Sequence, residues 1–285
     1  EFRRVLFRSG EIMQIFNDKV ALITGASRGI GTYIAKSLAK RGCRIVAIAR
    51  DKDKLSTLCQ EIENQGGNAS YIPLDLSEIH SIEPAINSLV DDGKRIDFLI
   101  NNAGIEQYRH LQNYTADQIS KIINVNLHAP IELTRILLPY MLENGGNIVN
   151  IASLGGKKGI AFNSIYSATK SGLIMWTDAM RQELNKTSVN ISVVCPGFIS
   201  EAGMFKDSNM EAPRLLGTSS PLDVVDAVIK CIEKNLAEVI VNKGPMKPLL
   251  SIGQLSPLLA DRIVGMMGVR EMSLRRVEAE KSTLK

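Results

Sequence analysis

Residues 147–170 read NIVNIASLGGKKGIAFNSIYSATK, and this stretch decides the fold and the chemistry expected of the chain. Its first part, Asn147 to Ala152, is an apolar, β-branched run of the kind that a fully buried parallel strand needs. A glycine-rich loop begins at Ser153, and a helix is predicted to follow it. On that helix Tyr166 and Lys170 are four residues apart, so their side chains lie on one face, about one turn from each other.

The pairing of Tyr166 with Lys170 predicts acid-base chemistry. A free phenol has a pKa of roughly 10, and a nearby ammonium favours the phenolate and lowers that pKa. We therefore expect Tyr166 to act as a general acid or base. Ser153 is expected to hydrogen-bond the oxygen that Tyr166 protonates, which is the geometry that a carbonyl under reduction requires. A Tyr-x-x-x-Lys pair also arises by chance, so this interpretation depends on the rest of the chain.

The composition favours a single large α/β domain. The chain has 285 residues, 45% of them hydrophobic, and neither a Pro/Ser-rich linker nor a repeat of fixed period divides it. The net charge of +4 is too small and too dispersed to indicate nucleic-acid binding. The four cysteines are widely spaced without histidine partners, so we expect no metal site and no disulfide. The sequence shows neither a signal peptide nor a membrane span, which favours a soluble, cytoplasmic protein.

A glycine-rich turn near the start of the chain predicts a phosphate site. Val20 to Thr24 is a buried-strand run that leads straight into this turn and then into a helical pattern. Glycines let the backbone turn sharply and approach a pyrophosphate, while the helix offers unpaired N–H groups and the positive end of its dipole. The residues expected to bind the cofactor here are Gly25, Ser27, Arg28, Gly29, Ile30 and Gly31.

Taken together, these motifs resemble the short-chain dehydrogenase/reductase family. The set consists of TGASRGIG at 24–31, NNAG at 101–104, Ser153, Tyr166 and Lys170. The resemblance covers about residues 17 to 242 and implies one doubly wound, Rossmann-type α/β domain: a seven-stranded parallel sheet with helices on both faces. It also implies hydride transfer between a nicotinamide cofactor and a carbonyl or secondary alcohol. Family members commonly pair into homodimers or homotetramers.

Two arginines predict a preference for NADP over NAD. The second predicted strand, Arg44 to Ala49, ends at Arg50, where an acidic residue would bind the adenosine ribose of NAD. Together with Arg28, Arg50 offers a cationic fork for the 2′-phosphate of NADP, because guanidinium groups bind phosphate bidentately. The alternative is that both arginines are solvated surface residues, one of them neutralised by Asp51.

The resemblance assigns further residues to the site. Asn126 matches an asparagine that holds a water in a proton relay to Lys170, and Asn124 is a competing candidate within the same predicted helix, Thr115 to Leu138. Glu201 stands just after the carboxamide-binding segment, near a position where a threonine often occurs, which leaves that contact in doubt. The remaining cofactor-binding residues that the resemblance implies are Asp75, Leu76, Asn102, Ala103, Gly104, Pro196, Gly197 and Ile199.

Three segments are harder to assign. Residues 1–16 are expected to be a disordered or non-native leader, and residues 199–217 are either a mobile lid over the substrate or an ordinary surface loop. The extension at 243–285 is apolar and then basic. We favour its packing on the cleft or on another subunit over contact with a membrane surface.

The apolar lid and extension favour a lipophilic ketone as the substrate, such as a 3-oxoacyl, steroid or aromatic carbonyl. The alternative function is that of a non-catalytic NADP-binding sensor or scaffold, against which the complete set of Ser153, Tyr166 and Lys170 argues. Hydride transfer to any carbonyl would distinguish the two.

Overall fold

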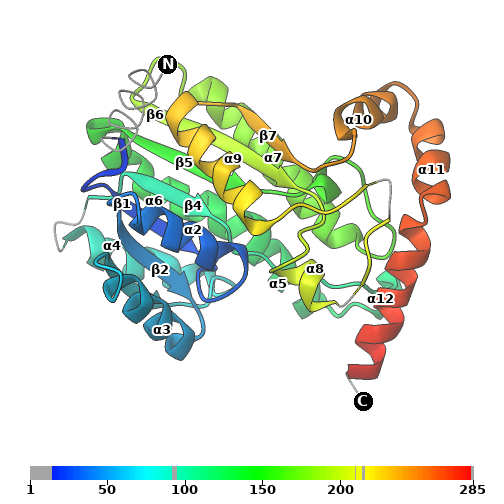
Figure 1. The fold of residues 1–285 in the computed structure, drawn as a ribbon, viewed down its shortest axis with the longest axis horizontal. Coiled ribbons are helices and arrows are strands. Elements are labelled where there is room, and N and C mark those ends of the chain that lie inside the picture. Colours follow the sequence, from blue (N-terminus) through cyan, green and yellow to red (C-terminus); the bar gives the residue numbers. More distant parts are fainter. Residues whose placement is uncertain (1–14, 92–94, 209, 214–215, 284–285) are drawn as a thin grey trace.

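The computed structural model describes residues 15–91, 95–208, 210–213 and 216–283. Seven strands form one sheet in the order β3-β2-β1-β4-β5-β6-β7, and every neighbouring pair is parallel (Figure 1). The strands are β1 (Val20–Thr24), β2 (Arg44–Ala49), β3 (Asn68–Pro73), β4 (Phe98–Asn101), β5 (Gly146–Ile151), β6 (Val189–Pro196) and β7 (Glu238–Val241). This confirms the predicted doubly wound, seven-stranded sheet.

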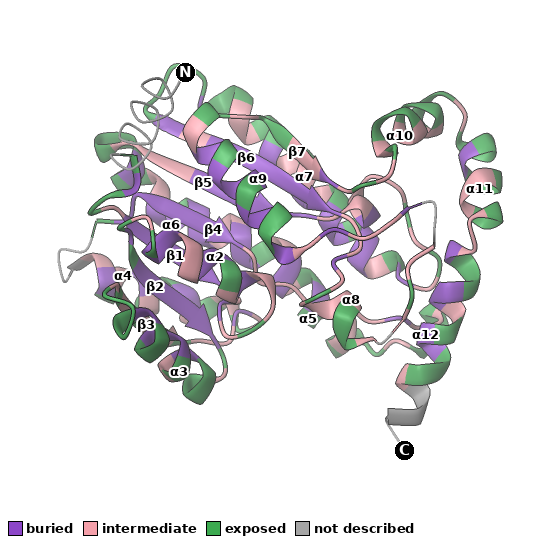
Figure 2. Ribbon diagram, viewed as in Figure 1, coloured by how far each residue is buried: buried purple, intermediate pink, exposed green. Residues whose placement is uncertain are grey.

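Helices cover both faces of this sheet. One face carries α2 (Ile30–Ala39), α3 (Lys52–Glu63) and α9 (Pro221–Lys234), and the other carries α4 (Ile82–Asp91), α6 (Ala129–Asn144) and α7 (Ser164–Glu183). The central strands are therefore buried on both sides (Figure 2), which is why they read as continuous apolar runs rather than alternating ones. The described residues also include three short 3₁₀ helices, η1 (Ile79–Ser81), η2 (Leu111–Asn113) and η4 (Leu154–Gly156).

The helix expected over Thr115 to Leu138 is interrupted by a wider turn. Thr115 caps α5 (Ala116–Ile123), and the π-helical turn η3 (Asn124–His128) then separates α5 from α6. An apolar period of about 3.6 residues cannot reveal one wide turn within a longer helix. The expectation of one continuous helix was wrong at this turn.

The core begins earlier in the chain than the sequence predicted. Phe16 is fully buried, and the centroid of its ring lies 5.7 Å from that of Phe98. Its carbonyl also accepts a hydrogen bond from the Cys43 thiol at 3.2 Å. Phe16 is thus part of the domain and not of a leader, while the prediction for residues 1–14 falls outside the described residues. All four cysteines are buried and free, as expected.

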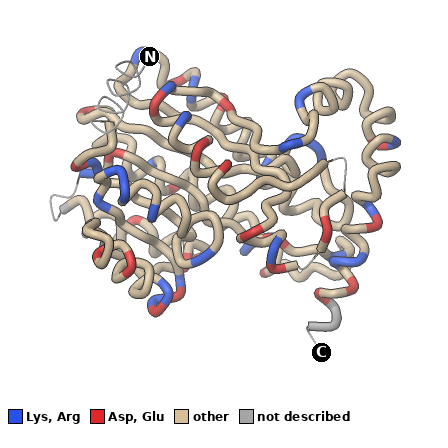
Figure 3. The backbone as a smooth tube through the Cα atoms, viewed as in Figure 1, with Lys and Arg blue, Asp and Glu red and all other residues tan. Residues whose placement is uncertain are grey.

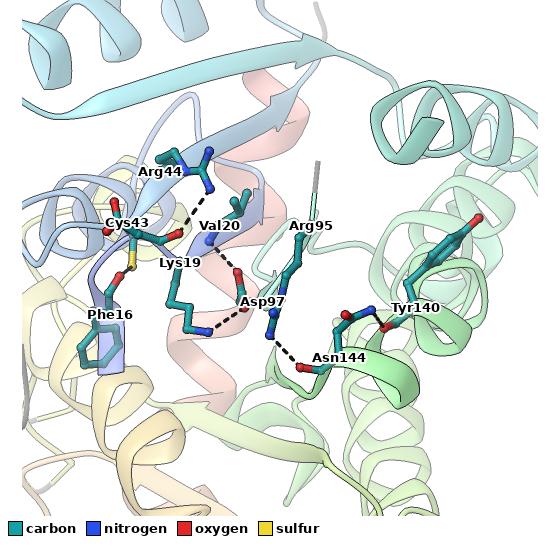
Figure 4. Close-up of polar contacts among 10 residues, drawn as sticks. Phe16, Lys19, Val20, Cys43, Arg44, Arg95, Asp97, Tyr140 and Asn144 are labelled. Carbon is teal, nitrogen blue, oxygen red and sulfur yellow. Dashed lines mark hydrogen bonds and ion pairs between the residues drawn. The ribbon is translucent and has the colours of Figure 1, made fainter. Parts of the chain in front are cut away.

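Asp97 joins three elements at the edge of the sheet where the strands begin (Figure 4). Its buried carboxylate accepts a hydrogen bond from the Val20 N–H at 3.0 Å and pairs with Lys19 Nζ at 3.0 Å. Arg95 Nε lies 2.9 Å from the same carboxylate, and Arg95 Nη2 donates to the Asn144 carbonyl at 2.6 Å. These contacts connect the starts of β1 and β4 with the end of α6.

Three helices follow β7 and lie at the edge of the sheet where the strands end (Figure 1). They are α10 (Met246–Leu255), α11 (Pro257–Met266) and α12 (Val269–Thr283). Among the described residues, no helix combines the length and the apolar character that crossing a membrane requires. Figure 3 shows basic and acidic residues interspersed along the traced chain.

We predict that Asp97→Ala lowers the free energy of unfolding by about 2 kcal/mol, because the buried Val20 N–H loses its acceptor. Urea unfolding followed by circular dichroism measures this difference. Asp226→Ala, at an exposed position of α9, is the matched control and should change stability by less than about 0.5 kcal/mol. An equal effect of both substitutions would contradict a structural role for Asp97.

Candidate active site

A cavity of about 610 Å³ lies at the ends of the strands, where the sequence placed the site. All of the predicted site residues line it except Gly31 and Asn126, which lie just behind its wall. The predicted residues that line the cavity are Gly25, Ser27, Arg28, Gly29, Ile30, Arg50, Asp75, Leu76, Asn102, Ala103, Gly104, Ser153, Tyr166, Lys170, Pro196, Gly197 and Ile199.

The glycine turn between β1 and α2 has the shape of a phosphate cradle. Gly25 and Gly29 have φ values of +66° and +62°, which side chains rarely adopt. A Cβ on Gly31 would lie 2.3 Å from the Gly25 carbonyl oxygen, so the third glycine lets the helix pack against the turn. The first turn of α2 has no side-chain cap, and its N–H groups point towards the cavity end of the helix. This arrangement fits the pyrophosphate of a dinucleotide.

Asn102 fixes the glycine turn to the neighbouring strand. Its side-chain Nδ2 donates to the Thr24 carbonyl at 2.9 Å, and the backbone N–H groups of Asn102 and Ala103 both donate to Thr24 Oγ1 at 3.0 Å. A Cβ on Gly25 would lie 2.8 Å from the Ala103 Cα, so the two loops are in close contact. The NNAG segment therefore supports the turn.

Lys170 is buried, and no acidic group of the described residues forms an ion pair with it. It is 2% exposed, and its Nζ donates to the carbonyl of Ile151, the last residue of β5, at 2.8 Å. Burial lowers the pKa of Lys170 from 10.5 to about 8, because a low-dielectric environment disfavours the charged form. The Nζ lies 5.8 Å from the centroid of the Tyr166 ring. The pair predicted from the four-residue spacing is thus present on one face of α7.

Tyr166 and Ser153 meet at the end of β5. Ser153 Oγ accepts a hydrogen bond from the Gly155 N–H at 3.0 Å and is also hydrogen-bonded to the Tyr166 hydroxyl. Both side chains line the cavity, next to Lys170. A carbonyl oxygen placed in the cavity can therefore meet two hydroxyl groups at once.

The expected fall in the pKa of Tyr166 does not arise from the protein's own groups. Burial is the largest influence and raises the pKa of Tyr166 above its ordinary value of 10, and the charge of Glu106 raises it further. The hydrogen bond with Ser153 and the charge of Arg276 act in the opposite direction. The spacing of tyrosine and lysine could be read from the sequence, but the depth at which they are buried could not, and burial raises the pKa of Tyr166.

Asn126 lies deeper than Asn124 and closer to the catalytic lysine. It is fully buried in the turn η3, where its Oδ1 accepts the Ile105 N–H at 2.8 Å and its Nδ2 donates to the Ile105 carbonyl at 2.9 Å. A Cβ on Gly104 would lie 3.5 Å from both Asn126 Oδ1 and Lys170 Nζ. Asn124 instead donates to a backbone carbonyl on the far side, that of Ser77, at 2.9 Å. The relay role of Asn126 stays a prediction.

Arg50 is available to a ligand in the cavity. Its nearest acidic partner is Asp75, at 4.0 Å, and the arginine side chain is 60% exposed. Asp51 is engaged elsewhere, since its carboxylate caps α3 by accepting the Lys54 N–H at 3.1 Å and pairs with Lys54 Nζ at 2.8 Å. Burial by itself would raise the pKa of Asp75. Hydrogen bonds from Ser77 and the charge of Arg50 outweigh burial, so the pKa of Asp75 is lowered.

The segment after β6 reaches the glycine turn. It contains the short helix α8 (Met204–Asp207), and Asp207 Oδ2 lies 2.5 Å from Arg28 Nη1. The rings of Phe198 and Phe205 are 4.8 Å apart between centroids, and both line the cavity. Glu201 is exposed and is not among the residues that line the cavity.

The C-terminal extension supplies one wall of the cavity, which sequence reasoning identified only in part. Of the leucines of this extension, Leu249 and Leu250 line the cavity, whereas Leu255 is 89% exposed. Residues of the wall that the sequence did not single out are Met246, Gly253, Gln254, Ala260, Val264, Met267, Val269 and Arg276, together with Glu106 and Tyr108 from the loop after β4. No periodic or spacing signal connects these residues, because the three helices meet the cavity at separate points.

Comparison with known proteins agrees with this geometry. Residues 19–212 match the family described as short chain dehydrogenase. The ketoacyl reductase HetN of Nostoc sp. is 48% identical over 272 residues, which cover 93% of this chain and 95% of that protein. A metagenomic short-chain oxidoreductase in complex with NADP is 34% identical, with a TM-score of 0.68, covering 79% of this chain and 98% of that one. A variant actinorhodin polyketide ketoreductase with NADPH is 29% identical, with a TM-score of 0.72 and coverages of 79% and 95%.

The buried Lys170 predicts a pH-dependent gain in stability for Lys170→Met. The fall of the Lys170 pKa from 10.5 to about 8 corresponds to a cost of about 3 kcal/mol to the folded state, fully present below pH 8. This cost disappears as the pH rises from the folded to the unfolded pKa. The variant should therefore be more stable near neutral pH by up to about 3 kcal/mol, and its advantage should shrink between about pH 8 and 10.5.

Urea unfolding of both proteins at a series of pH values measures this advantage. Lys230→Met, at an exposed position of α9, is the matched control and should show no pH-dependent difference from the parent chain. The burial argument would be contradicted if the difference in free energy of unfolding between Lys170→Met and the parent chain stayed constant from neutral to alkaline pH.

Proposed function

Because the chain belongs to the short-chain dehydrogenase family, we propose that it is an NADP(H)-dependent reductase that reduces the keto group of lipophilic 3-oxoacyl thioesters. Membership of the family makes it an oxidoreductase that acts on C=O and CH–OH groups. The relatives with ketoacyl and polyketide ketoreductase activity in their names support the acyl substrate. The structural relatives with NADP and NADPH support the cofactor.

The observation that carries the proposal is the continuity of the cavity from the catalytic hydroxyls to an apolar wall. Ser153 and Tyr166 border the same space as Met246, Leu249 and Val264 of the C-terminal extension. A keto group held at the two hydroxyls would extend its acyl chain along these side chains. Apolar contact of this kind favours a long alkyl chain over a short or polar one.

Each catalytic residue has a defined task in this reduction. NADPH, when bound, supplies the hydride that adds to the keto carbon. The Tyr166 hydroxyl donates a proton to the keto oxygen, so that the product is a secondary alcohol. Ser153 orients the keto oxygen by a second hydrogen bond, and Lys170, with Nζ 5.8 Å from the centroid of the Tyr166 ring, returns the proton and would hold the nicotinamide ribose. Asn126 would hold the next member of the relay.

We predict that kcat/KM rises with the length of the acyl chain. Each methylene buried against the apolar wall should add about 0.8 kcal/mol, or about a fourfold increase, until the wall is filled. The measurement is the loss of NADPH absorbance with a series of 3-oxoacyl N-acetylcysteamine thioesters, alongside a steroid ketone and an aromatic ketone. A preference for either of the latter, or no dependence on chain length, would contradict the acyl assignment.

The same assay tests the proton donor. Tyr166→Phe should lower kcat by about 10² to 10⁴-fold, because it removes general acid catalysis, while NADPH affinity changes little. Tyr140→Phe, at an exposed position of α6, serves as the matched control and should keep full activity. Binding of NADPH without reduction of any ketone would instead favour the non-catalytic sensor.

The exposed Arg50 predicts how the chain discriminates between cofactors. We expect Arg50→Ala to weaken NADPH binding about 10- to 100-fold, because one charged hydrogen-bonding partner of the 2′-phosphate is lost. NADH binding should stay nearly the same. Isothermal titration calorimetry measures both affinities, and Arg44→Ala, at the opposite end of β2, is the control. Equal losses for both cofactors would contradict phosphate recognition by Arg50.

A further inference from the structure

A buried ion pair connects the C-terminal extension with the helix that carries the catalytic tyrosine. Arg276 of α12 places its Nη2 3.0 Å from Oε2 of Glu106, and both side chains are less than a tenth exposed. The other carboxylate oxygen of Glu106 accepts a hydrogen bond from Asn163 Nδ2 at 2.7 Å. Asn163 is fully buried and immediately precedes α7, three residues before Tyr166. The carboxylate is thus held between two helices.

Both members of the pair also border the cavity. The Arg276 guanidinium lies over the Tyr108 ring, 3.9 Å from its centroid, and Glu106, Tyr108 and Arg276 line the same cavity as Tyr166. Helix α12 contacts this loop a second time, through Glu280 Oε1, which accepts the Tyr108 N–H at 3.0 Å. Because the guanidinium is already paired with a carboxylate, it is not free to bind an anionic substrate.

We propose that Arg276 is a positioning residue of the active site, which holds Glu106 in an ion pair and so offsets part of the effect of a buried negative charge on the Tyr166 hydroxyl. The inference rests on the proposed function, in which Tyr166 donates the proton. The two charges act on the hydroxyl in opposite directions: Glu106 raises the pKa of Tyr166 and Arg276 lowers it. Glu106 is the larger of the two influences, and Arg276 offsets part of it.

The groups that face Tyr166 come from every element packed against it. Glu106 carries the charge that acts on Tyr166 most strongly. Lys170 lies on the same helix, with Nζ 5.8 Å from the ring centroid, and its own ammonium is also influenced by Glu106. The other groups are Ser153 at the end of β5, Tyr108 in the loop after β4, and, beyond the ion pair, Arg109 and Glu280.

The test is a cycle of variants in which the ionisation of Tyr166 is measured directly. The full chain is labelled with tyrosine carrying carbon-13 at Cζ, saturated with NADP⁺ and titrated by NMR, and Tyr166→Phe identifies the resonance. Glu106→Gln should lower the apparent pKa of Tyr166 by about one unit, because the unpaired guanidinium remains charged. Arg276→Gln should raise it by a smaller amount, and the value for the double variant should lie between those of the two single variants.

Two further variants separate positioning from a merely structural role. Arg276→Lys keeps the charge and should leave the titration near that of the parent chain. Arg275→Gln, at the neighbouring exposed position of α12, removes an equal charge and should cause no shift. Shifts of the same sign in Glu106→Gln and Arg276→Gln, or no shift in Glu106→Gln, would overturn the proposal.

Folding of the variants does not limit the test. Glu106→Gln keeps an oxygen to accept the Asn163 hydrogen bond, so its downward shift decides the question even if Arg276→Gln fails to fold. With a 3-oxobutyryl N-acetylcysteamine thioester as substrate, the high-pH limit of kcat should move by the same amounts. If that thioester is not reduced, the proposed function fails while the NMR titration still decides the role of Arg276.

Discussion

The burial of an ammonium group beside a phenol is the constraint on which this site depends. Lys170 needs an acceptor for its Nζ protons inside the protein, and the carbonyl at the end of β5 provides one. That carbonyl is available only because β5 ends there and the chain turns away at Ser153. One requirement therefore determines where β5 ends, how the glycine-rich loop runs and where α7 begins. The buried ammonium of Lys170 must hydrogen-bond a backbone oxygen because it is shielded from water.

Most of the fold, and the place of the glycine turn at the cavity, could be predicted because each depends on a local pattern. The runs VALIT and RIVAIA coincide with β1 and β2, and the glycines of the first turn have the backbone angles that their positions implied. The pKa of Tyr166 and the π-helical turn could not be predicted. Burial depth and one extra residue in a turn are set by tertiary packing, and neither changes the apolar period of the sequence.

The C-terminal extension shows the same limit more strongly. Its composition indicated apolar packing, yet nothing in the sequence linked Arg276 to Glu106 or either of them to Tyr166. The contact joins segments far apart in the chain, and each residue alone resembles a solvated surface charge. A buried pair of this kind contributes little net stability, so its effect lies in the local field and geometry that it imposes on its neighbours. The catalytic domain and its extension thus share one electrostatic environment.

The wide turn Asn124–His128 fixes the number of residues between α5 and α6. It accommodates one residue more than an α-helical turn would, and deleting that residue would allow both helices to merge into one. All of α5 would then swing by about 100° around the common axis, since an α-helix has 3.6 residues per turn. Asn126 would lose its two hydrogen bonds with Ile105. The number of residues in this helical segment is therefore fixed by its packing.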